Sequence, residues 1–160
     1  MKYKLFRLLV GVSILSGCRA TARLYPVQGP LSAQTPTPVL LAKVTGAFNS
    51  GNMSVVLGDG EVCKGRWSTV PRAQVPKGAA TASTSSTDGM PSVWDTVYGS
   101  GFYVSHVLGT RLYVRSALTG DRGTVLNVEM YRPHNNESNI LGAIKGVAKD
   151  NKDNLYKLAF

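Results

Sequence analysis

The chain has 160 residues, with 18 Lys and Arg against 9 Asp and Glu, and 43% of its residues are apolar. Charged residues make up only 17%, below the ~25% usual in soluble domains, which excludes a coiled coil and a charge-rich disordered chain. With two Cys and two His, we expect no disulfide scaffold, no metal site and no cofactor. The composition leaves one small all-β or mixed domain.

The first 17 residues are organised as a secretory signal peptide. Lys2, Lys4 and Arg7 form a basic start without an acidic residue, and an apolar run of eight residues follows from Leu8 to Leu15. Eight helical residues span ~12 Å, whereas the hydrocarbon core of a bilayer is ~30 Å thick. We therefore expect a cleaved signal rather than a membrane-spanning helix.

The apolar run ends in Leu15-Ser16-Gly17-Cys18. This tetrapeptide resembles the lipobox of bacterial lipoprotein precursors, in which a lipid is attached to the Cys thiol before cleavage ahead of that Cys. The resemblance implies that Cys18 is lipidated and begins the mature chain; the alternative is a chance cysteine after an ordinary signal. In that family an Asp after the cysteine is associated with inner-membrane retention. Arg19 at this position therefore implies an outer-membrane lipoprotein, which we expect to face the periplasm.

Cleavage would also change the charge of the protein. Residues 1–17 hold three basic and no acidic residues, so the mature chain of 143 residues keeps 15 basic and 9 acidic residues, a net charge of +6. An exported protein of this charge meets anionic lipid head groups and cell-wall carboxylates, and we expect no nucleic-acid partner. The expected partners are the membrane, through the N-terminal lipid, and an envelope protein or an anionic envelope polymer.

Residues 18–38 are predicted to be a Pro-rich tether, since four prolines between Arg19 and Pro38 favour extended backbone. The piece from Leu24 to Leu31 is apolar enough to lie against the domain surface. Together with the segment Asp59 to Trp67, it resembles small bacterial envelope proteins of no assigned activity, and this resemblance implies no function.

Residues 39–160 show period-two patterning with turn signals every 8 to 12 residues, which predicts an antiparallel sandwich or barrel of about seven to nine strands. A low-complexity segment, residues 69–91, interrupts the pattern; 16 of its 23 residues are Ala, Gly, Ser, Thr or Pro, and we expect a flexible loop. Residues 140–149 suit a helix or a strand, and the turn after them favours a closing hairpin. The other expected strands are Val39–Phe48, Met53–Leu57, Glu61–Ser68, Ser92–Tyr98, Phe102–Leu108, Arg111–Leu118 and Thr124–Tyr131.

One pair of residues could support catalysis. With Cys18 lipidated, Cys63 is the sole remaining thiol, and pairing it with His106 would make a cysteine hydrolase of cell-wall peptides. However, Cys63 is expected in mid-strand beside an inward Trp67, and His106 alternates with apolar residues like a buried core histidine. We therefore expect a buried, inert thiol and no enzyme, with an intermolecular disulfide through Cys63 as a further alternative.

The basic residues give a binding hypothesis. Arg111, Tyr113 and Arg115 share one strand face, and Lys64 and Arg66 lie on the outer face of another strand. Such a cationic stripe would bind lipid phosphates or glycan carboxylates; the alternative is a solvated sheet face without a ligand.

These patterns together predict a lipid-anchored, non-catalytic binding or scaffold module of the outer membrane. The alternatives are the hydrolase that uses Cys63 and His106, and a structural lipoprotein subunit of a secretion or conjugation machine.

Overall fold

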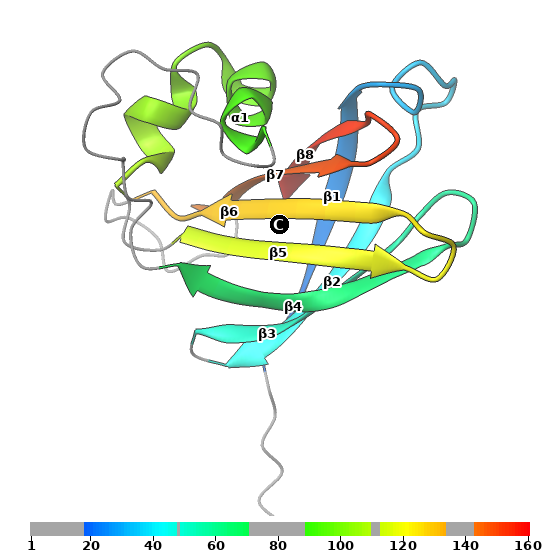
Figure 1. The fold of residues 1–160 in the computed structure, drawn as a ribbon, viewed down its shortest axis with the longest axis horizontal. Coiled ribbons are helices and arrows are strands. Elements are labelled where there is room, and N and C mark those ends of the chain that lie inside the picture. The colour runs from blue at the N-terminus through cyan, green and yellow to red at the C-terminus, as the bar shows by residue number, and fades with distance from the viewer. Residues whose placement is uncertain (1–17, 48, 71–88, 110–112, 134–142) are drawn as a thin grey trace, which may run out of the picture.

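The protein is a closed barrel of eight antiparallel strands (Figure 1). The computed structural model describes residues 18–47, 49–70, 89–109, 113–133 and 143–160. Each strand pairs with its neighbours in sequence, and β1 closes the barrel by pairing with β8. An all-β fold with seven to nine strands is thereby confirmed. The strands are β1 (Cys18–Gln28), β2 (Leu40–Ala47), β3 (Ser50–Val56), β4 (Val62–Val70), β5 (Tyr113–Gly120), β6 (Val125–Tyr131), β7 (Lys145–Asp150) and β8 (Leu155–Ala159).

The barrel interior is filled by apolar side chains from alternate positions of the strands. In β6, for example, Leu126, Val128 and Met130 are buried in this core. Side chains at the positions between them point out of the barrel, because successive residues of a strand face opposite sides. The same alternation buries Cys63 in β4 and leaves Lys64 exposed.

Strand β1 replaces the first half of the expected tether. Ala22 and Leu24 are buried in the barrel, whereas Arg23 between them is exposed. Pro26 is accommodated because the pairing of β1 with β8 shifts register between Pro26 and Gln28, and a proline is tolerated at such an irregularity. Burial of alternate apolar residues therefore decided the structure, and the prediction of a tether from proline content was wrong for this segment.

The chain after β1 also folds back on the barrel. Gly29 has a φ of 100°, and the Ser32 hydroxyl donates to its carbonyl oxygen at 2.7 Å. The Leu31 backbone N–H donates to the Asn154 side-chain oxygen at 2.8 Å, and the Leu31 side chain packs against the barrel core. These contacts tie the expected linker to the β7–β8 turn.

Two expected strands are helical instead. Residues 90–98 form the helix α1 (Met90–Tyr98), and a π-helical turn, η1 (Tyr103–Val107), follows. Met90, Val93 and Trp94 are spaced as on one helix face and are buried. The prediction of strands failed here because this helical spacing was read as alternation.

The helix α1 covers the outer surface of the barrel over β7 and β8 (Figure 1). A second apolar cluster forms there between α1 and outward side chains of the barrel such as Tyr131, Val147 and Leu155. Within it, the Trp94 indole N–H donates to the buried Glu129 carboxylate at 2.9 Å.

The predicted flexible loop over residues 69–91 was too long at both ends, because Thr69 and Val70 extend β4 through pairing with β5, and Met90 and Pro91 begin α1. The pair β7 and β8 forms the closing hairpin expected at the C-terminal end. Most of the low-complexity segment, residues 71–88, and residues 134–142 lie outside the described residues. In the described parts of the chain, the helices are too short and too polar to span a bilayer.

Candidate anion-binding groove

A row of polar side chains crosses the outer face of β2, β3 and β4. Lys43 of β2 pairs with Ser54 of β3, and Ser54 pairs with Lys64 of β4. Residues opposite one another in a sheet have their Cβ atoms ~4.5–5.5 Å apart, so the two lysines flank the Ser54 side chain. All three point outwards, since their neighbours Val55 and Cys63 are buried in the barrel.

A second row lies beside the first. It consists of Thr45, Asn52 and Arg66, again from β2, β3 and β4. The two rows line an open groove with a volume of about 510 Å³. The residues that line it carry two ammonium groups, one guanidinium group, two hydroxyls and one side-chain amide.

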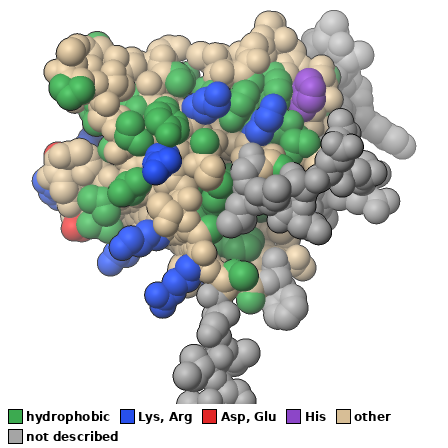
Figure 2. All heavy atoms as spheres, turned by 180° about the vertical axis from the view of Figure 1, so that it is seen from behind, with side chains coloured by type: hydrophobic (Ala, Val, Ile, Leu, Met, Phe, Trp, Pro, Cys, Tyr) green, Lys and Arg blue, Asp and Glu red, His purple; other side chains and the backbone are tan. Residues whose placement is uncertain are grey.

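The groove carries uncompensated positive charge. Among the described residues, no carboxylate pairs with the basic side chains that line it. Figure 2 shows the molecule from behind; on that face Lys and Arg side chains lie among hydrophobic ones, and acidic side chains appear only at the edge. The outward positions of β1 to β4 hold no Asp or Glu and five basic residues, namely Arg19, Arg23, Lys43, Lys64 and Arg66.

This arrangement suits binding of an anion. A guanidinium can make two parallel hydrogen bonds to a phosphate or carboxylate, and each ammonium adds a point charge with three donors. None of the residues that line the groove carries a carboxylate, an imidazole or a thiol. The groove thus offers hydrogen-bond donors and positive charge to an anion.

The predicted cationic stripe is only partly assembled. Lys64 and Arg66 line the groove, but Arg115 does not, because its guanidinium pairs with Glu129 of β6 at 2.9 Å. Tyr113 lies in β5 opposite Tyr131 and Val70, and Arg111 lies outside the described residues. Sequence reasoning missed Lys43, although the alternation of the strand already placed it on the outer face.

The structure does not bring Cys63 and His106 together. Cys63 is buried inside the barrel, and burial raises the pKa of its thiol, as expected for an unreactive cysteine. His106 belongs to η1 on the outside, where it is exposed and stacks on Phe102 with ring centroids 4.5 Å apart. The prediction of a buried core histidine was therefore wrong, since the segment is helical.

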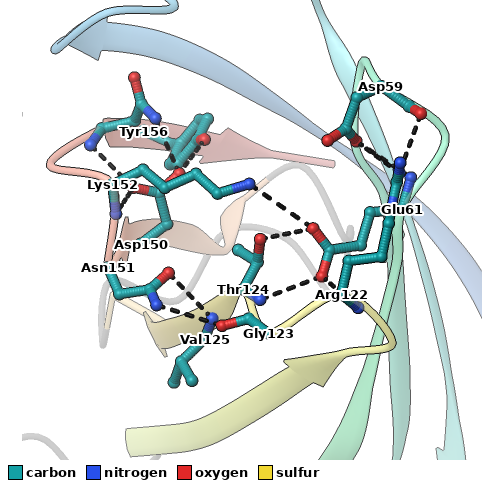
Figure 3. Close-up of polar contacts among 11 residues, drawn as sticks. Asp59, Glu61, Arg122, Gly123, Thr124, Val125, Asp150, Asn151, Lys152 and Tyr156 are labelled. Atoms are coloured by element: carbon teal, nitrogen blue, oxygen red, sulfur yellow. Dashed lines mark hydrogen bonds and ion pairs between the residues drawn. The ribbon is translucent and has the colours of Figure 1, made fainter.

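A second polar cluster closes one end of the barrel, where the β3–β4, β5–β6 and β7–β8 turns meet (Figure 3). The buried Glu61 carboxylate accepts hydrogen bonds from the Thr124 hydroxyl at 2.5 Å and from the backbone N–H groups of Thr124 and Arg122. The Lys152 ammonium lies 3.6 Å from it. The Thr124 hydroxyl, the backbone donors and Lys152 lower the pKa of Glu61 to about 2 against the opposing effect of burial.

Asp150 organises the neighbouring turn of the same cluster. Its carboxylate accepts hydrogen bonds from the backbone N–H groups of Lys152 and Asn154 and from the Tyr156 hydroxyl at 2.7 Å. Burial and the hydrogen bond to Asp150 raise the pKa of that hydroxyl. Because both carboxylates are saturated with donors, we interpret the cluster as structural. Within the described ranges, no group of acidic, His or Cys side chains could hold a metal ion.

Comparisons of the chain with protein-family models, with characterised proteins and with solved structures give no match. The function is therefore argued from the groove and from the sequence.

Proposed function

We propose that the protein is a lipid-anchored module of the bacterial outer membrane that binds anionic groups and does not catalyse. The lipidation of Cys18 is proposed from the lipobox-like sequence Leu15-Ser16-Gly17-Cys18. The binding role is proposed from the groove lined by Lys43, Lys64 and Arg66.

The observation that carries the binding role is the positive charge of the groove, which no carboxylate in the described part of the chain neutralises. Three cationic side chains line one open space, and no carboxylate in the described part of the chain pairs with them. Three basic residues outside the groove are paired instead: Arg115 with Glu129, Arg122 with Asp59 and Lys152 with Glu61. A cationic groove that the fold leaves unpaired is suited to an external anion.

The position of Cys18 is compatible with an anchor. Cys18 is exposed and pairs with Gly46 at the start of β1, so a lipid on its thiol would lie outside the barrel core. Arg19, the next residue, pairs with the groove residue Thr45. The proposed anchor and the groove therefore belong to the same end of neighbouring strands.

Palmitate labelling in a bacterial host tests the anchor. Cys18→Ala should abolish incorporation of labelled palmitate. Cys63, the sole other thiol in the chain, provides the control, and Cys63→Ala should keep the label. Full labelling of the Cys18→Ala protein would overturn the anchor.

Binding to inorganic polyphosphate tests the groove. The triple variant Lys43→Gln, Lys64→Gln, Arg66→Gln should bind about a hundredfold more weakly than wild type, at about fivefold per charge. The matched variant Lys145→Gln, Lys149→Gln, Lys157→Gln removes the same charge from β7 and β8 and should keep most of the affinity. Equal losses in the two variants would show a net-charge effect and overturn the groove.

A further inference from the structure

We infer that the groove and the surrounding outer face of β1 to β4 dock on the anionic surface of the same membrane that holds the lipid anchor. This inference names the ligand of the proposed function and rests on it. We define the docking face as the outward side chains of β1 to β4.

The geometry places the docking face next to the anchor. Cys18 is already paired with Gly46 in the barrel, so no spacer separates its thiol from the fold. Strands lie ~4.8 Å apart, which puts Arg66 of β4 about 15 Å from β1 across the sheet. A lipid inserted at Cys18 would thus hold the whole groove within about two Debye lengths of the lipid phosphates at physiological salt.

The charge of the docking face fits an anionic surface. Its five basic residues have no acidic neighbour among the outward positions of these four strands. Each Lys or Arg held near an anionic membrane strengthens binding about fivefold, and this gain disappears beyond roughly a Debye length. The anchor brings the β1 and β2 side of the docking face within this distance, and Lys64 and Arg66 of β4 reach it when the face lies against the membrane.

Exposed apolar side chains favour a membrane over a small soluble anion. Leu41 of β2 and Val56 of β3 are 51% and 47% exposed, and they pair with each other in the row next to Lys43 and Lys64. Val39, the residue before β2, is 48% exposed. A phosphate ion would leave these side chains in water, whereas a bilayer interface accepts apolar and cationic side chains together.

Lysine footprinting on vesicles tests the docking. The lipidated protein is reconstituted into vesicles of phosphatidylethanolamine with phosphatidylglycerol, or of phosphatidylcholine alone, and the acetylation rate of each lysine is measured by mass spectrometry. Lys43 and Lys64 should react about fivefold more slowly on the phosphatidylglycerol vesicles, and high salt should remove the protection. Lys145 and Lys149 of β7 are the internal reference, because β7 lies four strands from β3 in the closed barrel.

Three outcomes would overturn the docking. The first is equal reactivity of Lys43 and Lys64 on both kinds of vesicle, and the second is protection of the β7 lysines as strong as that of Lys43 and Lys64. The third is protection of Lys43 and Lys64 by glycerol phosphate in detergent as strong as that on vesicles, which would indicate a small-molecule site. The mass of the N-terminal peptide reports acylation separately. A missing acyl group would therefore count against the proposed function, and unchanged lysine reactivity on an acylated protein would count against the docking face.

Discussion

The outer surface of the barrel has two faces, one with exposed basic side chains that form no ion pair within the described ranges and one with a buried carboxylate that is paired. On the face formed by β1 to β4, Lys43, Lys64 and Arg66 lie in the open around a groove without a carboxylate partner in the described residues. On the face formed by β6 to β8, α1 covers the sheet, and the buried Glu129 receives hydrogen bonds from both Trp94 and Arg115.

The covered face is also ordered by aromatic stacking. Trp94, Tyr98, Phe102 and His106 follow one another at intervals of four residues, and successive ring centroids are 5.6, 4.7 and 4.5 Å apart. Even a lysine on this side has aromatic partners, since the Lys145 ammonium lies 5.5 Å from the Tyr98 ring centroid and 5.3 Å from that of Phe102.

The difference separates structural charges from available ones. A charge that the fold has already paired contributes to stability, and removing its partner leaves a desolvated group. A charge that the fold leaves unpaired contributes little to stability and is free to meet a ligand. Substitutions on the covered face should therefore lower stability, whereas substitutions on the open face should lower ligand binding.

The largest effect on stability is expected for Trp94→Ala. The Trp94 side chain is fully buried between α1 and the barrel, and its loss creates a cavity and removes a donor from Glu129. The free energy of unfolding should fall by about 3–5 kcal/mol, measured by urea denaturation. Leu41→Ala on the open face is the control and should change it by less than about 1 kcal/mol, because half of that side chain is already in water. Equal losses would contradict the distinction between the faces.

A smaller loss is expected for Glu129→Gln. The amide keeps an acceptor for Trp94 but removes the negative charge that pairs with Arg115 at 2.9 Å. Hydrogen bonds to charged groups contribute about 1.5–3 kcal/mol, so a loss of that order is expected in urea denaturation. Asp59→Asn provides the comparison, because its pair with Arg122 is half exposed on both sides and should contribute at most about 1 kcal/mol. A larger loss for Asp59→Asn than for Glu129→Gln would reverse the expected order.

The two faces also show how much of the molecule could be predicted from its sequence. Strict alternation predicted β2, β4 and β6 to within a few residues. Alternation failed in β1, because the prolines in and after that segment masked the buried positions Ala22 and Leu24. A register shift beside Pro26 is a tertiary feature that composition does not reveal.

The helix on the covered face could have been predicted from the 3.6-residue period of its apolar residues. Residues Ser92–Tyr98 were predicted as a strand, yet Met90, Val93 and Trp94 have helical spacing. The stacking of Phe102 on His106 likewise follows from a spacing of four residues within helical backbone. In this part of the chain the helical period, and not alternation, predicts which side chains are buried.

The candidate groove was predictable in part. The outward positions of Lys64 and Arg66 followed from the pattern of one strand, but their association with Lys43 depends on the register of β2 against β3 and β4. Arg115 was misassigned because its partner Glu129 lies on the next strand, and the sequence does not show that α1 buries this carboxylate.

Acidification should reduce the stability that the Glu61 carboxylate contributes at the end of the barrel. No residue that lines the groove has a carboxylate to protonate. The pKa of Glu61 is lowered to about 2 from an ordinary value of 4.5, so its stabilising contribution is complete above pH 4.5 and is lost as the pH falls toward 2. Unfolding of wild type and Glu61→Gln should therefore be compared between pH 6 and pH 2. The difference in unfolding free energy should shrink across this window, and a difference that stays constant would show that the hydrogen bonds of Glu61 do not distinguish its ionised form.

The smallest effect on stability is expected at the groove itself. Lys64 is exposed, and Lys43 lies across β3 at about 10 Å, close enough for like charges to repel at moderate salt. Lys64→Gln removes this repulsion without breaking any pair, so the free energy of unfolding should stay within about 0.5 kcal/mol of wild type or rise slightly, more so at low salt. Thermal unfolding at two salt concentrations measures both effects. A clear loss of stability would mean that the fold already uses this charge, and the groove would then have less of it to offer a ligand.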